Sequence, residues 1–171
     1  LFRSAAIDDR FAAGTITSRI GLEANAIPFE GKTDIAAIVA ERHAHEKIAC
    51  VLVDEAQFLT SAQVDQLAHL ADVVGIPVLA YGLRTDFQGQ LFPGSARLLA
   101  LADSLIELKS VCECGRKATM NLRVDEQGRA VVEGAQTEIG GNDRYVALCR
   151  RHLVVARQAK SEEHTSELQS H

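Results

Sequence analysis

The chain has 171 residues, of which 47% are hydrophobic, and this is enough for one domain with a real core and a small appended module. Its 18 basic and 23 acidic side chains give a net charge of −5, which excludes a broad basic surface for nucleic acid or anionic membrane. No apolar run reaches the roughly 18 to 20 residues of a membrane span, and no signal-peptide pattern opens the chain. We therefore expect a cytoplasmic protein with no nucleic-acid or membrane partner.

The first residues have the character of a strand that begins partway, at positions 1–7, so we expect the chain to be a fragment. Further on, Gly31-Lys32-Thr33 resembles the end of a phosphate-binding loop. That motif needs a glycine where Ala26 stands, so we do not assign it this role. Thr33 is instead predicted to cap a helix over about residues 34–47.

The chain is organised around a short apolar run at residues 48–53 that leads into Asp54 and Glu55. Such a run predicts a strand buried on both faces of a parallel α/β sheet. Ligands bind beyond the carboxyl ends of these strands, and an apolar strand ending in Asp is the Walker B arrangement of Mg²⁺-nucleotide sites. The next carboxylate can then activate a nucleophile. The alternative is an acidic residue that only favours the dipole of the following helix, and this stretch alone leaves both possibilities open.

Helices and strands alternate after this run. Thr60 and Gln63 predict a capping box for a helix that continues to about Val73 and ends at Gly75. Residues 76–82 predict the next buried strand, and this order favours a parallel sheet. A loop, a helix over residues 95–102 and a last strand over residues 104–109 complete the predicted elements of this part.

Three of the four cysteines and a histidine then occur as two close pairs late in the chain. Cys112 and Cys114 lie in one tight turn, and Cys149 and His152 have C-x-x-H spacing beyond a predicted hairpin at 119–133. Two close ligand pairs around a loop predict a closed tetrahedral Zn²⁺ site of the structural kind, and a module this small needs such a crosslink to fold. The alternative is buried thiols and a surface histidine. Cys50 is excluded because we place it inside the central strand.

These patterns divide the chain into a partial α/β nucleotide-binding domain at residues 1–109 and a zinc-binding domain at residues 110–160. Residues 161–171 show no periodicity, and we expect them to be a non-native tail.

Sequence motifs at positions 6–11, 17–22, 51–59, 81–87, 112–118 and 139–145 coincide with one family. On these motifs the chain resembles bacterial thymidine kinase of the type that carries a zinc-held lasso domain, from Leu1 to about Ala159. The resemblance implies a RecA-like P-loop kinase fold with a parallel sheet, followed by the small lasso domain. The family's first strand, Gly-rich P-loop and helix are not in this sequence, so we expect these residues alone to be inactive. We also expect the absent strand to neighbour the one carrying Asp54.

The resemblance implies transfer of the γ-phosphoryl group of ATP, held with Mg²⁺, to the 5′-hydroxyl of thymidine. Glu55 would be the general base and Asp54 would organise Mg²⁺. The remaining residues near ATP would be Asp8, Asp9, Arg10, Ala56 and Gln57. Thymidine would be bound by Phe87 and Phe92, by Tyr145 at the deoxyribose, and by the lasso backbone at Gln136, Thr137, Glu138, Ile139 and Gly140.

The family also implies a homotetramer that thymidine triphosphate inhibits. Two other functions stay open. Asp-Glu-Ala-Gln at residues 54–57 also spells a helicase box, which would make the chain a RecA-like ATPase fragment whose glutamate activates water. The third possibility is a non-catalytic zinc-binding interaction module.

Overall fold

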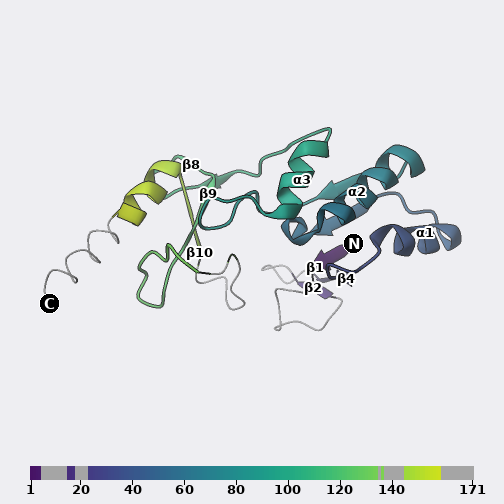
Figure 1. Ribbon diagram of the computed structural model, residues 1–171, viewed down its shortest axis with the longest axis horizontal. Helices are drawn as coiled ribbons and strands as arrows, with labels where there is room; N and C mark the ends of the chain where they lie inside the picture. Colours follow the sequence, from purple (N-terminus) through teal and green to yellow (C-terminus); the bar gives the residue numbers. More distant parts are fainter. Residues whose placement is uncertain (5–14, 18–22, 135, 137–144, 159–171) are drawn as a thin grey trace, which may run out of the picture. The chain divides into compact units, whose positions relative to one another are not determined.

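The computed structural model describes residues 1–4, 15–17, 23–134, 136 and 145–158 (Figure 1). The chain divides into two compact units, residues 1–84 with 91–105, and residues 85–90 with 106–171. The loop at 85–90 therefore groups with the second unit, whereas the domain boundaries expected from the sequence remain a prediction.

The first unit is built on a four-stranded parallel sheet with the strand order β4-β1-β5-β6. The strands are β1 (Phe2–Ser4), β4 (Ile27–Phe29), β5 (Val51–Asp54) and β6 (Val78–Ala80). The predicted parallel α/β fold is confirmed. The sequence did not reveal β4, which contains Pro28 and lies at the edge of the sheet, where a residue without an N–H is tolerated. Two more short strands, β2 (Thr15–Thr17) and β3 (Glu23–Asn25), pair with each other antiparallel.

The strand order corrects one expectation. β5 carries Asp54 and is already paired on both sides, with β1 and with β6. We had expected the absent family strand to neighbour β5. That expectation is wrong, because both edges of β5 are already paired. Among the described strands of this sheet only β4 and β6 have an open edge.

The helices of this unit begin and end at local sequence signals. α1 (Ile35–His45) is capped by Asp34, whose side chain accepts the Ala37 N–H. Thr33 was therefore the wrong cap, and its hydroxyl accepts the Glu30 N–H instead. α2 (Ser61–His69) has the predicted capping box. A π-helical turn, η2 (Leu70–Val74), continues the helix, which is terminated by Gly75 at φ 79°. α3 (Pro93–Leu101) begins at a proline and matches the predicted helix with a slightly earlier start.

One face of the sheet is packed more tightly than the other. Along β5, Val51 and Val53 are 2% and 0% exposed, whereas Leu52 and Asp54 are only half-buried. The prediction of a strand buried on both faces was therefore wrong for one face. The apolar core formed with α1 and α2 contains Phe2, Phe29, Ile35, Val39, Val51, Val53, Ala56, Leu59, Val64, Leu67, Leu70 and Ile76.

The second unit consists of short antiparallel pairs and a helix. β7 (Ser110–Val111) pairs with β8 (Lys117–Ala118), and β9 (Met120–Arg123) pairs with β10 (Tyr145–Leu148). Of the hairpin predicted at 119–133, the turn at 125–128 and an isolated bridge between Val124 and Ala130 are present, but β9 pairs with β10 and residues 129–133 form no strand. A helix follows at residues 150–158.

The predicted last strand at 104–109 is wrong. These residues are irregular, and Ile106 and Leu108 are 83% and 71% exposed. An apolar run forms a strand only when a partner supplies the ladder of hydrogen bonds, and no described strand pairs with this segment.

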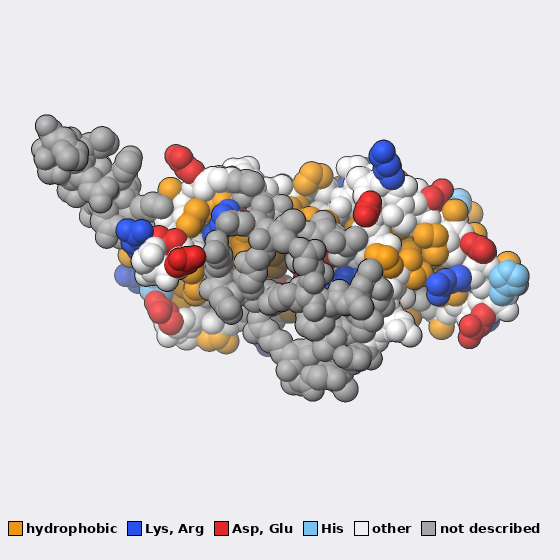
Figure 2. All heavy atoms as spheres, turned by 90° about the horizontal axis from the view of Figure 1, so that it is seen from below, with side chains coloured by type: hydrophobic (Ala, Val, Ile, Leu, Met, Phe, Trp, Pro, Cys, Tyr) orange, Lys and Arg blue, Asp and Glu red, His pale blue; other side chains and the backbone are white. Residues whose placement is uncertain are grey.

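Surface charge follows the composition. On the face shown in Figure 2, Lys and Arg side chains are interspersed with Asp and Glu rather than gathered in one patch. None of the helices in the described ranges is long and apolar enough to cross a membrane.

Candidate functional site

The turn after β5 holds the two carboxylates that the sequence singled out. Asp54 ends the strand, and Glu55 follows with φ 55°, the one non-glycine residue of the described chain with a positive φ. A glutamate in this left-handed conformation carries a strain of about 1 to 3 kcal/mol, which persists only when the surrounding structure enforces it. Such strain is typical of functional turns at the carboxyl edge of a parallel sheet.

Asp54 lies beside a cation of the neighbouring strand. Its Oδ2 is 3.9 Å from Nε of Arg3, which is opposite it in the register of β1 and β5. Its Oδ1 accepts the Glu55 N–H at 3.0 Å. The carboxylate is half-buried, so it can still meet a hydrated cation at this edge.

Ala56 and Gln57, which we expected to line the ATP site, are 1% and 2% exposed. They belong to the 3-10 turn η1 (Ala56–Phe58). The Gln57 amide donates to Oε2 of Glu55 at 2.6 Å and accepts the Leu83 N–H at 3.0 Å. Its polar atoms are thus engaged within the protein, which favours a supporting role for this side chain over direct contact with a ligand.

The two phenylalanines predicted for thymidine belong to different units. Phe92 is 4% exposed at the start of α3, and its ring meets Phe58 edge-on with centroids 5.6 Å apart. In the second unit, Phe87 is 1% exposed with the guanidinium of Arg123 over its ring at 5.3 Å, and its carbonyl accepts from Arg157.

Asp86 is a buried polar residue that the sequence analysis did not assign. It is 3% exposed, and its Oδ1 accepts the N–H groups of Gln88 and Gln90, both at 2.8 Å. Its Oδ2 accepts from the side chain of Gln136 at 3.0 Å, so it joins the 85–90 loop to a predicted thymidine residue. The signal for it was an aspartate at the start of a loop, where its oxygens can accept N–H groups two residues on.

The remaining predicted ligand residues are only partly visible. Tyr145 begins β10 and is 37% exposed. Asp8, Asp9, Arg10, Thr137, Glu138, Ile139 and Gly140 lie outside the described residues.

The four predicted zinc ligands come together in the second unit. One ligand atom from each of Cys112, Cys114, Cys149 and His152 lies within 4.8 Å of all the others. The Sγ atoms of Cys114 and Cys149 are 3.8 Å apart, and Sγ of Cys112 is 3.3 Å from Nδ1 of His152. A tetrahedron with Zn–S bonds of about 2.3 Å has edges of about 3.8 Å, so both the donor set and its spacing are compatible with zinc.

The surroundings shift the pKa values of two of these thiols in opposite directions. Backbone N–H groups of Cys114 and Cys149 lower the pKa of Cys112 from 9.0 to about 6. At Cys114 the Arg116 N–H acts in the same direction. Burial and the neighbouring thiols of Cys112 and Cys149 outweigh it and raise the pKa of Cys114. Cys50, which we placed inside the central strand, is exposed just before it and takes no part in the cluster.

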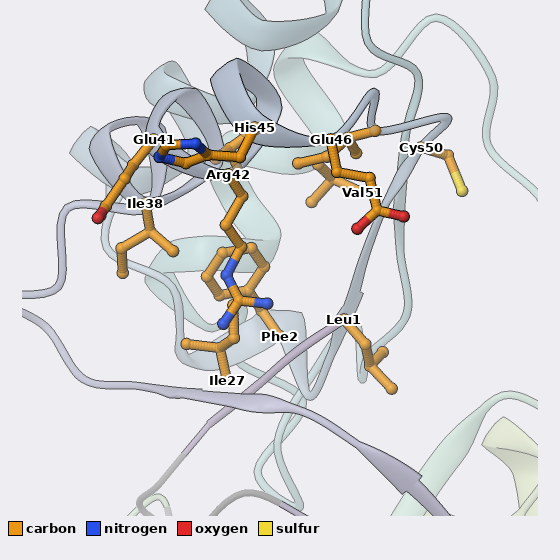
Figure 3. Close-up of a pocket in the computed structure, with 12 residues that line it drawn as sticks. Leu1, Phe2, Ile27, Ile38, Glu41, Arg42, His45, Glu46, Cys50 and Val51 are labelled. Atoms are coloured by element: carbon orange, nitrogen blue, oxygen red, sulfur yellow. The ribbon is translucent and has the colours of Figure 1, made fainter.

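A separate pocket lies at the opposite, amino-terminal end of the sheet in the first unit. It has a volume of about 620 Å³, and Figure 3 shows Phe2, Ile27 and Val51 in its lining, the first residues of β1, β4 and β5. None of the predicted site residues lines it, so we assign it no part in catalysis.

Comparison with known proteins gives one family. A family model described as thymidine kinase matches residues 1–153. The chain is 66% identical over 150 residues to a thymidine kinase of Novosphingobium aromaticivorans. This match covers 88% of this chain and 78% of the relative. It is 57% identical over 152 residues to that of Idiomarina loihiensis, covering 89% and 79%, and 57% identical over 154 residues to that of Zymomonas mobilis, covering 90% and 80%.

These matches give no support to the alternative of a helicase fragment. They agree with the parallel sheet, with the carboxylates at its edge and with the cysteine cluster. The chain belongs to the thymidine kinase family.

Proposed function

We propose that this protein transfers the γ-phosphoryl group of ATP to the 5′-hydroxyl of thymidine. The observation that carries the proposal is the match of residues 1–153 to the thymidine kinase family, with Asp54 and Glu55 at the carboxyl edge of the sheet. An ATP-dependent kinase of this family positions its two substrates and neutralises charge, so little covalent chemistry is asked of the protein itself.

Glu55 is proposed as the general base that accepts the proton of the 5′-hydroxyl, because it is a half-buried carboxylate held in a strained turn beside Asp54. Asp54 would hold the Mg²⁺ that accompanies ATP, through the water shell of the ion. Asp8, Asp9 and Arg10 are proposed near the phosphates. We propose that Ala56 and Gln57 shape the ATP site from beneath, since both are buried.

The thymidine site is proposed around Phe87, Phe92, Tyr145 and the lasso backbone at 136–140. An uncharged pyrimidine is readily recognised by backbone N–H and C=O groups together with aromatic packing. The hydrogen bond between Gln136 and Asp86 supports this proposal, since it ties one end of the lasso to the loop that carries Phe87.

A structural Zn²⁺ is proposed for the second unit, held by Cys112, Cys114, Cys149 and His152. Bound there, it would crosslink the two ends of the segment that contains β9 and β10, and it would take no part in the chemistry. Purified protein should carry about one zinc per chain. Metal analysis of carefully reconstituted protein that finds no zinc would contradict this assignment.

Further properties of the family are proposed for this protein. We propose a homotetramer that thymidine triphosphate inhibits by feedback. The four free cysteines fit a reducing compartment, so we place the enzyme in the cytoplasm.

The test of the function is an assay of thymidine phosphorylation, free of host kinases. It compares the chain as given with the same chain carrying a family strand, P-loop and helix before Leu1, which we call the extended chain. The sequence has no P-loop, and Mg²⁺ at Asp54 is useful only beside phosphates that other groups hold, so we expect activity from the extended chain alone.

Two outcomes would contradict the proposal. RNA-stimulated ATP hydrolysis without thymidine phosphorylation by the extended chain would favour a helicase. A folded, zinc-loaded extended chain that binds neither thymidine nor ATP would favour a zinc interaction module. Phosphorylation by the chain as given would instead show that no P-loop is needed.

A further inference from the structure

Gln57 has a buried side-chain amide whose two hydrogen bonds go beyond shaping the ATP site. It is 2% exposed, and its amide lies between two groups of the first unit. Nε2 donates to Oε2 of Glu55 at 2.6 Å, and Oε1 accepts the backbone N–H of Leu83 at 3.0 Å. Since the carboxylate can only accept and the Leu83 N–H can only donate, the amide has a single orientation that satisfies both.

The other end of this link is itself fixed. The Leu83 carbonyl accepts from the hydroxyl of Ser95 in α3 at 2.6 Å. The Ala56 N–H donates to the Tyr81 carbonyl at 2.8 Å, so the turn after β5 and the segment after β6 are held together twice. The Glu55 carboxylate is therefore connected through Gln57 to both β6 and α3.

The space around this amide requires glycine at position 82. A Cβ placed on Gly82 would be 2.5 Å from Oε1 of Gln57 and 3.0 Å from its backbone nitrogen. On the other side, a Cβ on Gly94 would be 2.8 Å from the Gln57 carbonyl oxygen. Two glycines thus allow the backbone of the neighbouring segments to close on this turn, which leaves the Gln57 side chain little freedom to move.

We propose that Gln57 is the positioning residue of the reaction, which holds the Glu55 carboxylate at a fixed place at the carboxyl edge of the sheet by tying it to the 82–83 backbone. The proposal rests on the proposed function, in which Glu55 is the base. A glutamate that acts as a base loses rotational freedom about several side-chain bonds. A charge-assisted hydrogen bond from a buried amide restricts this rotation before the substrate arrives.

The kinetic test uses the extended chain with Gln57→Met, which keeps the length of the side chain and removes both hydrogen bonds. We expect kcat to fall about 10-fold or more, which corresponds to a lost hydrogen bond to a charged group, while the KM for thymidine stays within about twofold. Gly82→Ala, which displaces the amide without altering Gln57, should lower kcat in the same way. Because the two variants disturb the same hydrogen bonds by different substitutions, the test does not fail if one of them does not fold.

A double substitution separates positioning from general damage. If Gln57 acts through Glu55, then Gln57→Met should cause no further loss of kcat in a Glu55→Gln background. Gln63→Met is the matched control, since Gln63 is also 2% exposed but its amide bonds only to groups around residues 30, 33 and 60. It should lower stability and leave the kcat of the folded enzyme unchanged in both backgrounds.

A readout without activity completes the test. In the nitrogen-15 NMR spectrum of the extended chain, the side-chain amide resonance of Gln57 should shift on Glu55→Gln, while that of Gln63 should not. A kcat within about twofold of the parent in folded Gln57→Met would overturn the proposal. So would a loss of kcat on Gln57→Met that is as large in the Glu55→Gln background as in the parent, or a Gln57 resonance that does not shift. A parent enzyme with no thymidine phosphorylation and a shifted resonance would overturn the proposed function and leave the Gln57–Glu55 link in place.

Discussion

The two units of this chain are stabilised in different ways. The first unit buries a continuous apolar core between β5, α1 and α2, including Ile35, Val53 and Leu67. The second unit has a smaller core, and two of its buried members, Cys112 and Cys149, belong to the metal-ligand cluster. The first unit therefore relies on hydrophobic burial, whereas the second combines short strand pairs with the ligand cluster at which we propose a zinc crosslink.

The same division applies to the proposed reaction. The groups assigned to proton and phosphoryl transfer, Asp54 and Glu55, come from the first unit, and most groups assigned to the thymine base come from the second. A change in the first unit should therefore affect the chemical step, and a change in the second should affect recognition of thymidine.

Removal of the metal should have the largest structural effect. In the zinc-loaded extended chain, a strong chelator should abolish hydrogen-exchange protection in β9 and β10 and leave the amides of β5 and β6 protected. Cys149→Ser should give the same pattern. Cys50→Ser is the control, since Cys50 is exposed and outside the cluster. Equal loss of protection in both units on chelation would show that their stabilities are not separate.

A cavity in the first core should have the opposite effect. Leu67 is 2% exposed, so Leu67→Ala should lower the free energy of unfolding of the first unit by about 2 to 5 kcal/mol. The zinc content of the chain should not change. Leu99→Ala, at a residue 38% exposed on α3, should cost less than about 1 kcal/mol in the same denaturation experiment. Loss of zinc in Leu67→Ala would contradict the separation.

The smallest effect is expected at the turn of the hairpin. The backbone N–H of Arg129 lowers the pKa of Asp125 from 3.8; burial opposes this, and the Arg129 side chain and the Gln127 N–H add to the lowering, so the net direction is down. A carboxylate with a lowered pKa contributes stability above its ordinary pKa and loses it as pH falls through the folded value. Asp125→Asn should therefore speed amide exchange at residues 127–131 slightly at neutral pH. The difference from the parent should disappear in acid, and a difference that grows in acid would be inconsistent with this sign.

Local signals in the sequence predicted much of this structure. The presence of a strand at β5, the Thr60–Gln63 capping box and the end of the helical segment at Gly75 depend on neighbouring residues, and these three features are confirmed. The four residues predicted to bind zinc were selected because their spacing is itself a local pattern, and the structure brings them together, while zinc binding itself stays a proposal.

Features set by distant residues were missed or wrong. The pairing of β9 with β10 joins segments separated by a long loop, and nothing in either segment specifies the other. The run at 104–109 has the alternation of a strand, but alternation alone does not supply a partner. Likewise the Gln57 side chain could be assigned to ATP from the motif, while its link to Leu83 requires the fold that brings β6 beside β5.

The division of chemistry and thymidine recognition between the two units can be tested with two variants of the extended chain in one steady-state assay. Glu55→Gln should lower kcat about 100-fold or more with little change in the KM for thymidine, because the carboxylate acts in the transition state. Cys149→Ser should raise the KM for thymidine more than that for ATP, because it loosens the unit proposed to recognise the base. If both variants changed the same kinetic parameter, or if Glu55→Gln turned over at a near-normal rate, the division of chemistry and recognition between the two units would be contradicted.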